Sequence, residues 1–235
     1  MLAWRDLYIK KDGFSKEEAL EPQRILEILS TYLVLLFSLS VHESAHAWTA
    51  LRMGDETAFR KGRISLNPLV HMDPFGTVVF PLVGLFAGGI VFGWAKPVPI
   101  QPRHFTNVRQ GEILTAGAGP FSNFVLAVAF AVLYSVMVQS FGLDRSHLLV
   151  FIARIGIVLN VVLGIFNLIP VPPLDGSHIA SWGLPRGLAE VYSRVVRPYG
   201  FMILVLLLIS GALDVVFDYL AWPVIRALMQ FGGGI

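Results

Sequence analysis

The chain has 235 residues, of which 55% are hydrophobic and only 14% are charged. An average soluble domain carries about 25% charged residues, so the composition excludes an ordinary water-soluble fold and predicts a membrane protein. The formal net charge of +2 is too small to indicate a nucleic-acid partner, and the absence of cysteine excludes disulfides and thiolate metal ligands.

The first 24 residues alternate acidic and basic side chains. They lack the apolar run and the small-residue cleavage site of a signal peptide. We expect residues 1–24 to form an interfacial segment at the membrane surface. Residues 25–235 are expected to form one domain, with its core in residues 25–180.

Long apolar runs predict membrane-spanning helices, because a helix needs about 20 residues to cross the hydrocarbon. The clearest runs are residues 25–51, 112–141, 147–169 and 199–220. A fifth run, residues 76–94, contains Pro81 and several glycines, which favours a re-entrant or β-hairpin segment buried against protein. Residues 215–231 predict a further half-helix. The expected fold class is an all-α polytopic membrane protein with about five to six transmembrane helices, a re-entrant segment and a broken helix.

The first predicted span contains three polar residues that suggest metal chemistry. His42 and His46 are four residues apart, so a helix places them one turn apart on the same face. Two imidazoles in this arrangement can bind one zinc ion, and the neighbouring Glu43 can reach a metal-bound water as a general base. The alternative is a polar patch at a helix interface, with both histidines hydrogen-bonded to carbonyl groups.

A catalytic zinc site has three protein ligands and one open position. Three prolines between residues 170 and 173 must end the preceding helix, and Gly176 permits a tight turn beside Asp175. Taken alone, Asp175 is explained more simply as an acidic residue at a helix end that faces water. Next to an unexplained zinc motif, we predict that it is the third ligand.

These motifs resemble those of the site-2 proteases, zinc metalloproteases that cut substrate helices within the membrane. The sequence HESAH (42–46) is similar to the zinc-binding signature of that family. The sequence NLIPVPPLDG (167–176) is similar to its second signature, with Asp175 at the position of the third ligand. Residues 62–77, 93–105 and 116–123 also resemble the compact bacterial branch, which lacks PDZ and CBS domains. The resemblance covers residues 35–180.

Further site residues follow from position and resemblance together. Asn167 lies one turn before Pro170 and is a candidate to hold the substrate backbone or the developing oxyanion. Asn123 is a second such candidate, with hydrogen bonding across a close helix contact as the alternative. His178 is a candidate to hydrogen-bond to one of the metal ligands without binding the metal itself. Residues 94–100 are expected either to pair with an unwound substrate strand by β-addition or to form a plain loop.

Shared zinc binding by His42, His46 and Asp175 requires their two helices to end on the same side of the membrane. This in turn requires that residues 76–94 do not cross it. Most basic residues outside the N-terminal segment then lie at the zinc end: Arg52, Arg60, Lys61, Arg63, Lys96, Arg103, Arg109, Arg186, Arg194 and Arg197. The loop at the other end has only Arg145. This asymmetry predicts a multi-pass protein of the cell (inner) membrane with the zinc end towards the cytoplasm, although the basic residues of segment 1–24 oppose it.

The resemblance implies an intramembrane zinc endopeptidase that hydrolyses peptide bonds within or near transmembrane segments, as in regulated intramembrane proteolysis. The implied cofactor is Zn²⁺, and the implied partners are a single-span membrane protein or signal-peptide substrate and the lipid bilayer. One alternative is a transporter or channel with a metal-binding polar site, for which inverted repeats are expected but not found. The other is a non-cleaving, substrate-binding relative, which usually lacks a ligand or the base.

Overall fold

The computed structural model describes residues 22–79 and 94–232, which form helices and connecting segments without any strand. Four helices in these residues are long and apolar enough to cross a membrane: Ile25–Arg52, Val108–Ser140, Leu148–Asn167 and Gly187–Ile209. The prediction of an all-α polytopic membrane protein is therefore confirmed. The expected segment 1–24 lies mostly outside the described residues, and the first helix already begins at Pro22.

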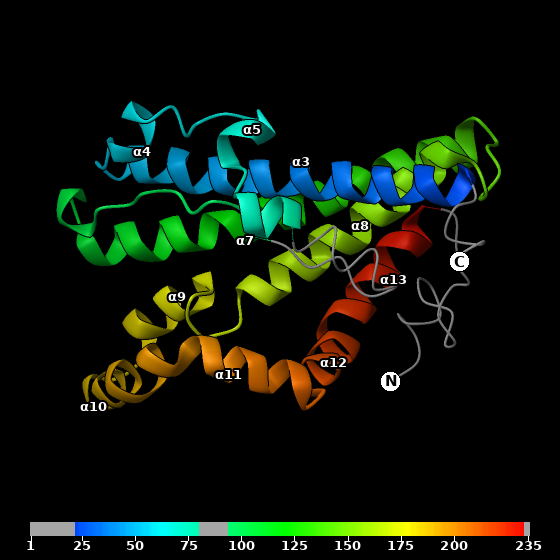
Figure 1. Ribbon diagram of the computed structural model, residues 1–235. Coiled ribbons are helices and arrows are strands. Elements are labelled where there is room, and N and C mark those ends of the chain that lie inside the picture. Colours follow the sequence, from blue (N-terminus) through cyan, green and yellow to red (C-terminus); the bar gives the residue numbers. More distant parts are fainter. Residues whose placement is uncertain (1–21, 80–93, 233–235) are drawn as a thin grey trace.

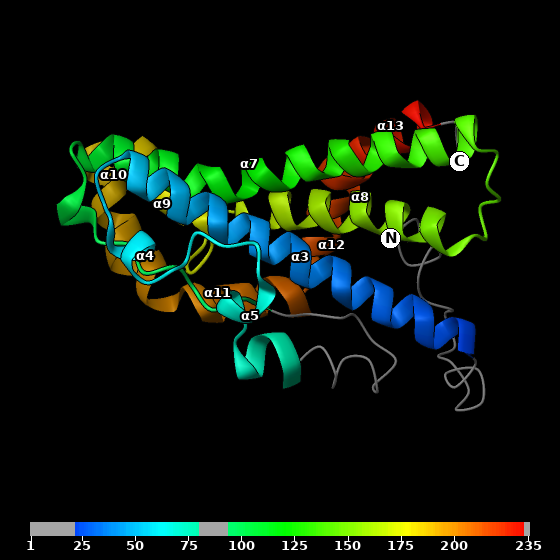
Figure 2. The same cartoon turned by 90° about the horizontal axis from the view of Figure 1, so that it is seen from above.

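Three long helices form the core of the bundle (Figure 1). They are α3 (Pro22–Arg52), α7 (Val108–Ser135) and α8 (Leu148–Asn167). Helices α3 and α8 run in the same direction. Helix α7, which comes between them in the sequence, runs in the opposite direction. Figure 2 shows α8 lying between α3 and α7 over much of its length. All three helices pack against one another.

Glycines allow α7 and α8 to approach each other closely. A Cβ atom at Gly156 of α8 would lie 2.4 Å from the ring of Phe130 on α7, and one at Gly164 would lie 2.9 Å from Phe124. The surrounding core consists of small and branched apolar side chains. Many large apolar side chains, such as Phe121, are instead exposed on the outer surface. This is the expected pattern where the surrounding solvent is lipid hydrocarbon.

The shorter elements connect and flank these helices. They are α4 (Thr57–Arg60), α5 (Pro68–His71), η1 (Pro74–Val79), η2 (Pro102–His104), η3 (Val136–Ser140), α9 (Asp175–Gly183), α10 (Arg186–Val191), η4 (Tyr192–Val196), α11 (Arg197–Ile209), α12 (Ala212–Val216), η5 (Phe217–Ala221) and α13 (Trp222–Phe231). Helix α9 packs against α7, whereas α10 and α11 lie farther from the three long helices. Helix α13 returns to pack on α7 and α8 (Figure 1). Gly211, with φ of 73°, forms the turn between α11 and α12. The bounds of the span predicted over 199–220 are therefore wrong, because the membrane-length helical run is Gly187–Ile209.

The helix break that precedes Asp175 follows from the prolines. Helix α8 ends at Asn167 and α9 begins at Asp175. A Cβ atom at Gly176 would lie 2.2 Å from the carbonyl oxygen of Leu168, so the first turn of α9 packs directly on the end of α8. Only glycine fits this approach, and the close contact fixes the direction in which Asp175 projects.

Residues 76–94 fall partly outside the described residues, which exclude 80–93. The described parts on either side lie next to each other. Trp94 donates its backbone N–H to the carbonyl of Gly76 (3.1 Å), and Lys96 donates to the carbonyl of His71 (2.8 Å). The chain therefore leaves and re-enters the described structure at one place, which the re-entrant prediction requires.

The contact at Gly176 leads to a stability prediction. The substitution Gly176→Ala is expected to lower the free energy of unfolding by about 3 kcal/mol, because the added Cβ meets backbone atoms that cannot turn aside. In detergent-solubilised protein this corresponds to a fall in Tm of roughly 5 °C or more. Gly183→Ala is the matched control, since it lies on the same helix and its Cβ would meet nothing within 4 Å. An equal loss in both variants would contradict the steric explanation.

Candidate metal centre

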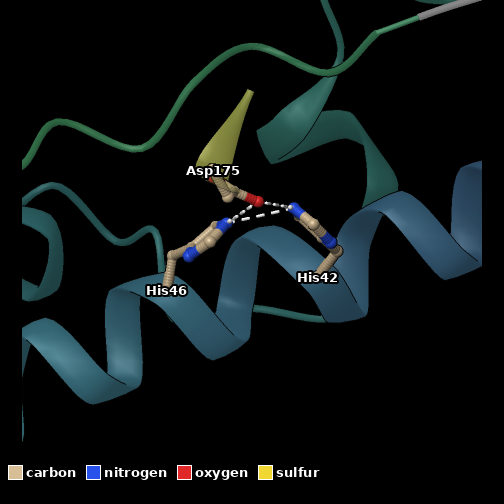
Figure 3. A group of neighbouring side chains, drawn as sticks. All are labelled: His42, His46 and Asp175. Atoms are coloured by element: carbon tan, nitrogen blue, oxygen red, sulfur yellow. Dashed lines mark hydrogen bonds and ion pairs between the residues drawn. The ribbon is translucent and has the colours of Figure 1, made fainter. Parts of the chain in front are cut away.

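Three electron-pair donors converge between α3 and the start of α9 (Figure 3). The Nε2 atoms of His42 and His46 are 3.0 Å apart. The Oδ2 atom of Asp175 lies 3.2 Å from the first and 3.3 Å from the second. Each histidine is only 5% exposed. Ligand atoms about 2.0–2.1 Å from a tetrahedral zinc ion are roughly 3.4 Å apart, so this triangle has nearly the size that zinc requires.

The hydrogen bonds around the two imidazole rings leave both Nε2 atoms as acceptors. His46 donates from Nδ1 to the backbone carbonyl of Thr115 (2.6 Å), which can only accept. The Nδ1 atom of His42 lies 2.6 Å from Oδ1 of Asn123. In their neutral forms both rings therefore direct an Nε2 lone pair at the Asp175 carboxylate. Among the described residues, the buried Oδ2 atom of Asp175 accepts no hydrogen bond. A cation placed between them would satisfy all three atoms, so the donor set fits zinc.

Space for the rings is provided by a glycine on α7. A Cβ atom at Gly119 would lie 2.4 Å from Nε2 of His46 and 2.6 Å from Cε1 of His42. Any side chain at this position would occupy the place of the ligand atoms. Gly119 is therefore part of the metal centre although it contributes no ligand.

Glu43 lies between the two histidines in sequence and is half-buried. Its Oε2 atom accepts a hydrogen bond from the backbone N–H of Val98 (3.0 Å). Val98 belongs to the extended segment 94–101, so the carboxylate is oriented by a part of the chain distant from it in sequence. This places an acidic group beside the metal ligands, where a general base is needed.

Buried side chains hold the extended segment in place. The guanidinium of Arg63 donates to the carbonyls of Val70 (2.9 Å) and Lys96. Burial lowers the pKa of His71 below the ordinary histidine value. Its ring is therefore neutral at pH 7, and its Nε2 atom lies 2.8 Å from the carbonyl oxygen of Ser65. With the bond from Lys96 to the carbonyl of His71, both backbone groups of Lys96 are fixed by the protein.

The end of the segment is held by Asp55, which is completely buried. Its carboxylate accepts from the backbone N–H groups of Gln101 (2.6 Å) and Thr57 (3.0 Å). Burial alone would raise the pKa of Asp55, but these N–H groups hold it below the ordinary aspartate value. The carboxylate is thus charged at neutral pH and anchors the segment to the end of α3.

Of the remaining predicted site residues, Asn123 contacts the group of three donors, and Asn167 and His178 do not belong to it. Asn123 is completely buried behind His42, bonded to that ring and to Asn160. Asn167 is half-buried and donates to the carbonyl of Leu163 on its own helix (3.0 Å). His178 is exposed on α9 and is not among the three grouped donors. Sequence reasoning missed Asn160, for which an asparagine within an apolar span was the available signal.

Comparisons with known proteins agree with this chemistry. The family model described as "Peptidase family M50" matches residues 143–210. The chain is 37% identical over 206 residues to "Putative zinc metalloprotease YwhC" of Bacillus subtilis, an alignment covering 85% of this chain and 88% of that protein. It is 35% identical over 184 residues to "Putative zinc metalloprotease Rip2" of Mycolicibacterium smegmatis, covering 76% of this chain and 66% of that protein. No solved structure matches the chain.

The glycine at the metal centre gives a direct test. We expect Gly119→Ala to abolish zinc binding, because the added Cβ occupies the space of both imidazole rings. Zinc content would be measured on the purified protein by elemental analysis. Gly117→Ala lies on the same helix, and its Cβ would meet nothing within 4 Å, so this control should retain zinc. Full zinc content in both variants would contradict the proposed ligand geometry.

Proposed function

This chain belongs to peptidase family M50, the site-2 protease family, and we propose that it hydrolyses peptide bonds within or near transmembrane segments. The protein is a multi-pass membrane zinc metalloprotease. The observation that carries the finer proposal is the depth of the metal centre. At about 1.5 Å per residue, His42 and His46 lie roughly 15 and 9 Å along α3 from its last residue, Arg52. A bond cut at this site would itself lie within the thickness of the membrane.

Zinc held by His42, His46 and Asp175 would activate water for attack and polarise the scissile carbonyl. Glu43 would accept the proton that water loses and deliver it to the leaving amine. The hydrogen bond from Val98 keeps one oxygen of this carboxylate in place, which supports a fixed orientation during proton transfer. Asn167 is proposed to hold the substrate backbone or the developing oxyanion after its side chain leaves the carbonyl of Leu163.

The extended segment supports the proposal that substrates bind by β-addition. The N–H groups of Trp94, Lys96 and Val98 all bond to the protein. In an extended chain the alternate residues face the other way, so the opposite edge carries residues 95, 97 and 99. Pro97 and Pro99 have no N–H to offer. A substrate strand on that edge would therefore pair mainly by donating its own N–H groups to carbonyls of this chain.

The proposed location is the cell (inner) membrane, with the metal centre towards the cytoplasm. Basic residues at the end where α3 finishes support this orientation, among them Arg52, Arg60 and Arg103. The proposed substrate is a single-span membrane protein or a signal peptide, cut in regulated intramembrane proteolysis. Residues 25–235 would form the protease domain around a core of 25–180, with 1–24 as an interfacial segment.

The role of Glu43 is tested by cleavage of co-expressed, tagged single-span proteins. We expect Glu43→Gln to retain zinc, since Glu43 is not a ligand, and to reduce cleavage about 100-fold or more. Glu56→Gln is the control, because Glu56 is exposed and pairs only with Arg60 on its own helix turn among the contacts described. Unchanged cleavage by Glu43→Gln would show that the activity does not come from this site.

The orientation can be tested because the native chain has no cysteine. Single cysteines would be introduced at the exposed positions Arg60 and Arg145, which lie at opposite ends of the core helices. In intact cells, a membrane-impermeant thiol reagent is expected to label Arg145→Cys, and Arg60→Cys only after permeabilisation. The reverse pattern would place the metal centre on the outer side.

A further inference from the structure

A chain of buried polar side chains leads from the metal centre through all three core helices. His42 on α3 contacts Asn123 on α7. Asn123 donates from Nδ2 to Oδ1 of Asn160 on α8 (2.9 Å), and Asn160 donates from Nδ2 to Oγ of Ser38, back on α3 (2.9 Å). Asn123 and Asn160 are 0% exposed. Uncharged amides in an apolar span are costly unless they are bonded, so a specific role is expected.

Within this series of hydrogen-bonded side chains, the orientation of each amide is determined by the next group in the series. The Nδ2 group of Asn160 has two hydrogens, which go to Oγ of Ser38 and to the backbone carbonyl of Gly156 (2.9 Å). Because a backbone carbonyl can only accept, Asn160 must present its Oδ1 atom to Asn123. Asn123 must then turn its Nδ2 group towards Asn160 and its Oδ1 atom towards His42.

We propose that Asn160 is a positioning residue that sets the tautomer of His42 through Asn123. An oxygen facing Nδ1 keeps the imidazole proton on that atom and leaves the Nε2 lone pair for zinc. If Asn123 were reversed, its N–H would face Nδ1. The proton would then move to Nε2, where it blocks the ligand atom. This inference rests on the zinc site of the proposed function.

The two histidines differ in how they are controlled. His46 donates to the carbonyl of Thr115. A backbone carbonyl can only accept a hydrogen bond and cannot turn to present a donor instead. His42 depends on a side-chain amide, which can rotate by 180° with little change in shape. Only His42 therefore needs a second residue to fix its partner, and Asn160 is the residue bonded to that partner.

Zinc affinity, measured by chelator competition on the purified full-length protein, tests the inference without reference to proteolysis. Asn160→Leu removes the acceptor that orients Asn123 and is expected to weaken zinc binding about 10- to 100-fold. Asn160→Asp should bind zinc within about threefold of the wild type, because a buried, neutral carboxyl group keeps one acceptor oxygen and one O–H donor. Cobalt(II) would report ligand geometry, and its visible spectrum should change in the leucine variant only.

Val161→Ala is the structural control. Val161 is the next residue of α8 and is also 0% exposed, so its truncation weakens packing without touching the amide chain. It should lower Tm and leave zinc affinity unchanged. Equal zinc affinity in Asn160→Leu and the wild type, or equal losses in Asn160→Leu and Val161→Ala, would overturn the positioning role alone. A wild-type protein that binds no zinc would overturn the proposed function together with this inference.

Discussion

Three electron-pair donors converge inside an apolar helical bundle, and the need to hold them together is the constraint on which the metal centre depends. The Nε2 atoms of His42 and His46 and the Oδ2 atom of Asp175 lie within 3.0–3.3 Å of one another. No donor among the described residues lies between them. Burial strengthens repulsion between partial negative charges, because the surrounding dielectric constant is low. A cation held between them would satisfy all three atoms at once, and the donor set has the composition that zinc requires.

The helices meet this constraint by close approach at two glycines. Gly119 brings α7 against the imidazole rings, and Gly176 brings α9 against the end of α8. Each glycine removes the side chain that would separate a ligand from its partners. In a membrane, where lipid is as apolar as the helix surfaces, such approaches also favour helix association through packing. The same contacts therefore hold the bundle together and assemble the metal centre.

The grouping of the three candidate donors could be predicted from the sequence because local rules place them. The i, i+4 spacing puts His42 and His46 on one helix face, and the prolines after Asn167 force the break that precedes Asp175. The residues behind the ligands could not be predicted in this way. Asn160 is 118 residues from His42 in sequence, and nothing local says that α8 lies beside Asn123. The early end of α11 at Ile209 was also missed, since apolar composition continues across the turn that Gly211 forms with its left-handed backbone conformation.

The hydrogen bond between Glu43 and Val98 connects the proposed base to the segment proposed to bind substrate. Arg63, His71 and Asp55 immobilise that segment on both sides of Val98, so the N–H that orients the carboxylate is itself fixed. A rigid segment carries little ordering cost when a substrate strand pairs with it. It also keeps the base in one orientation before substrate arrives, as preorganised catalysis requires. If both proposals hold, substrate alignment and base alignment would depend on the same few backbone groups.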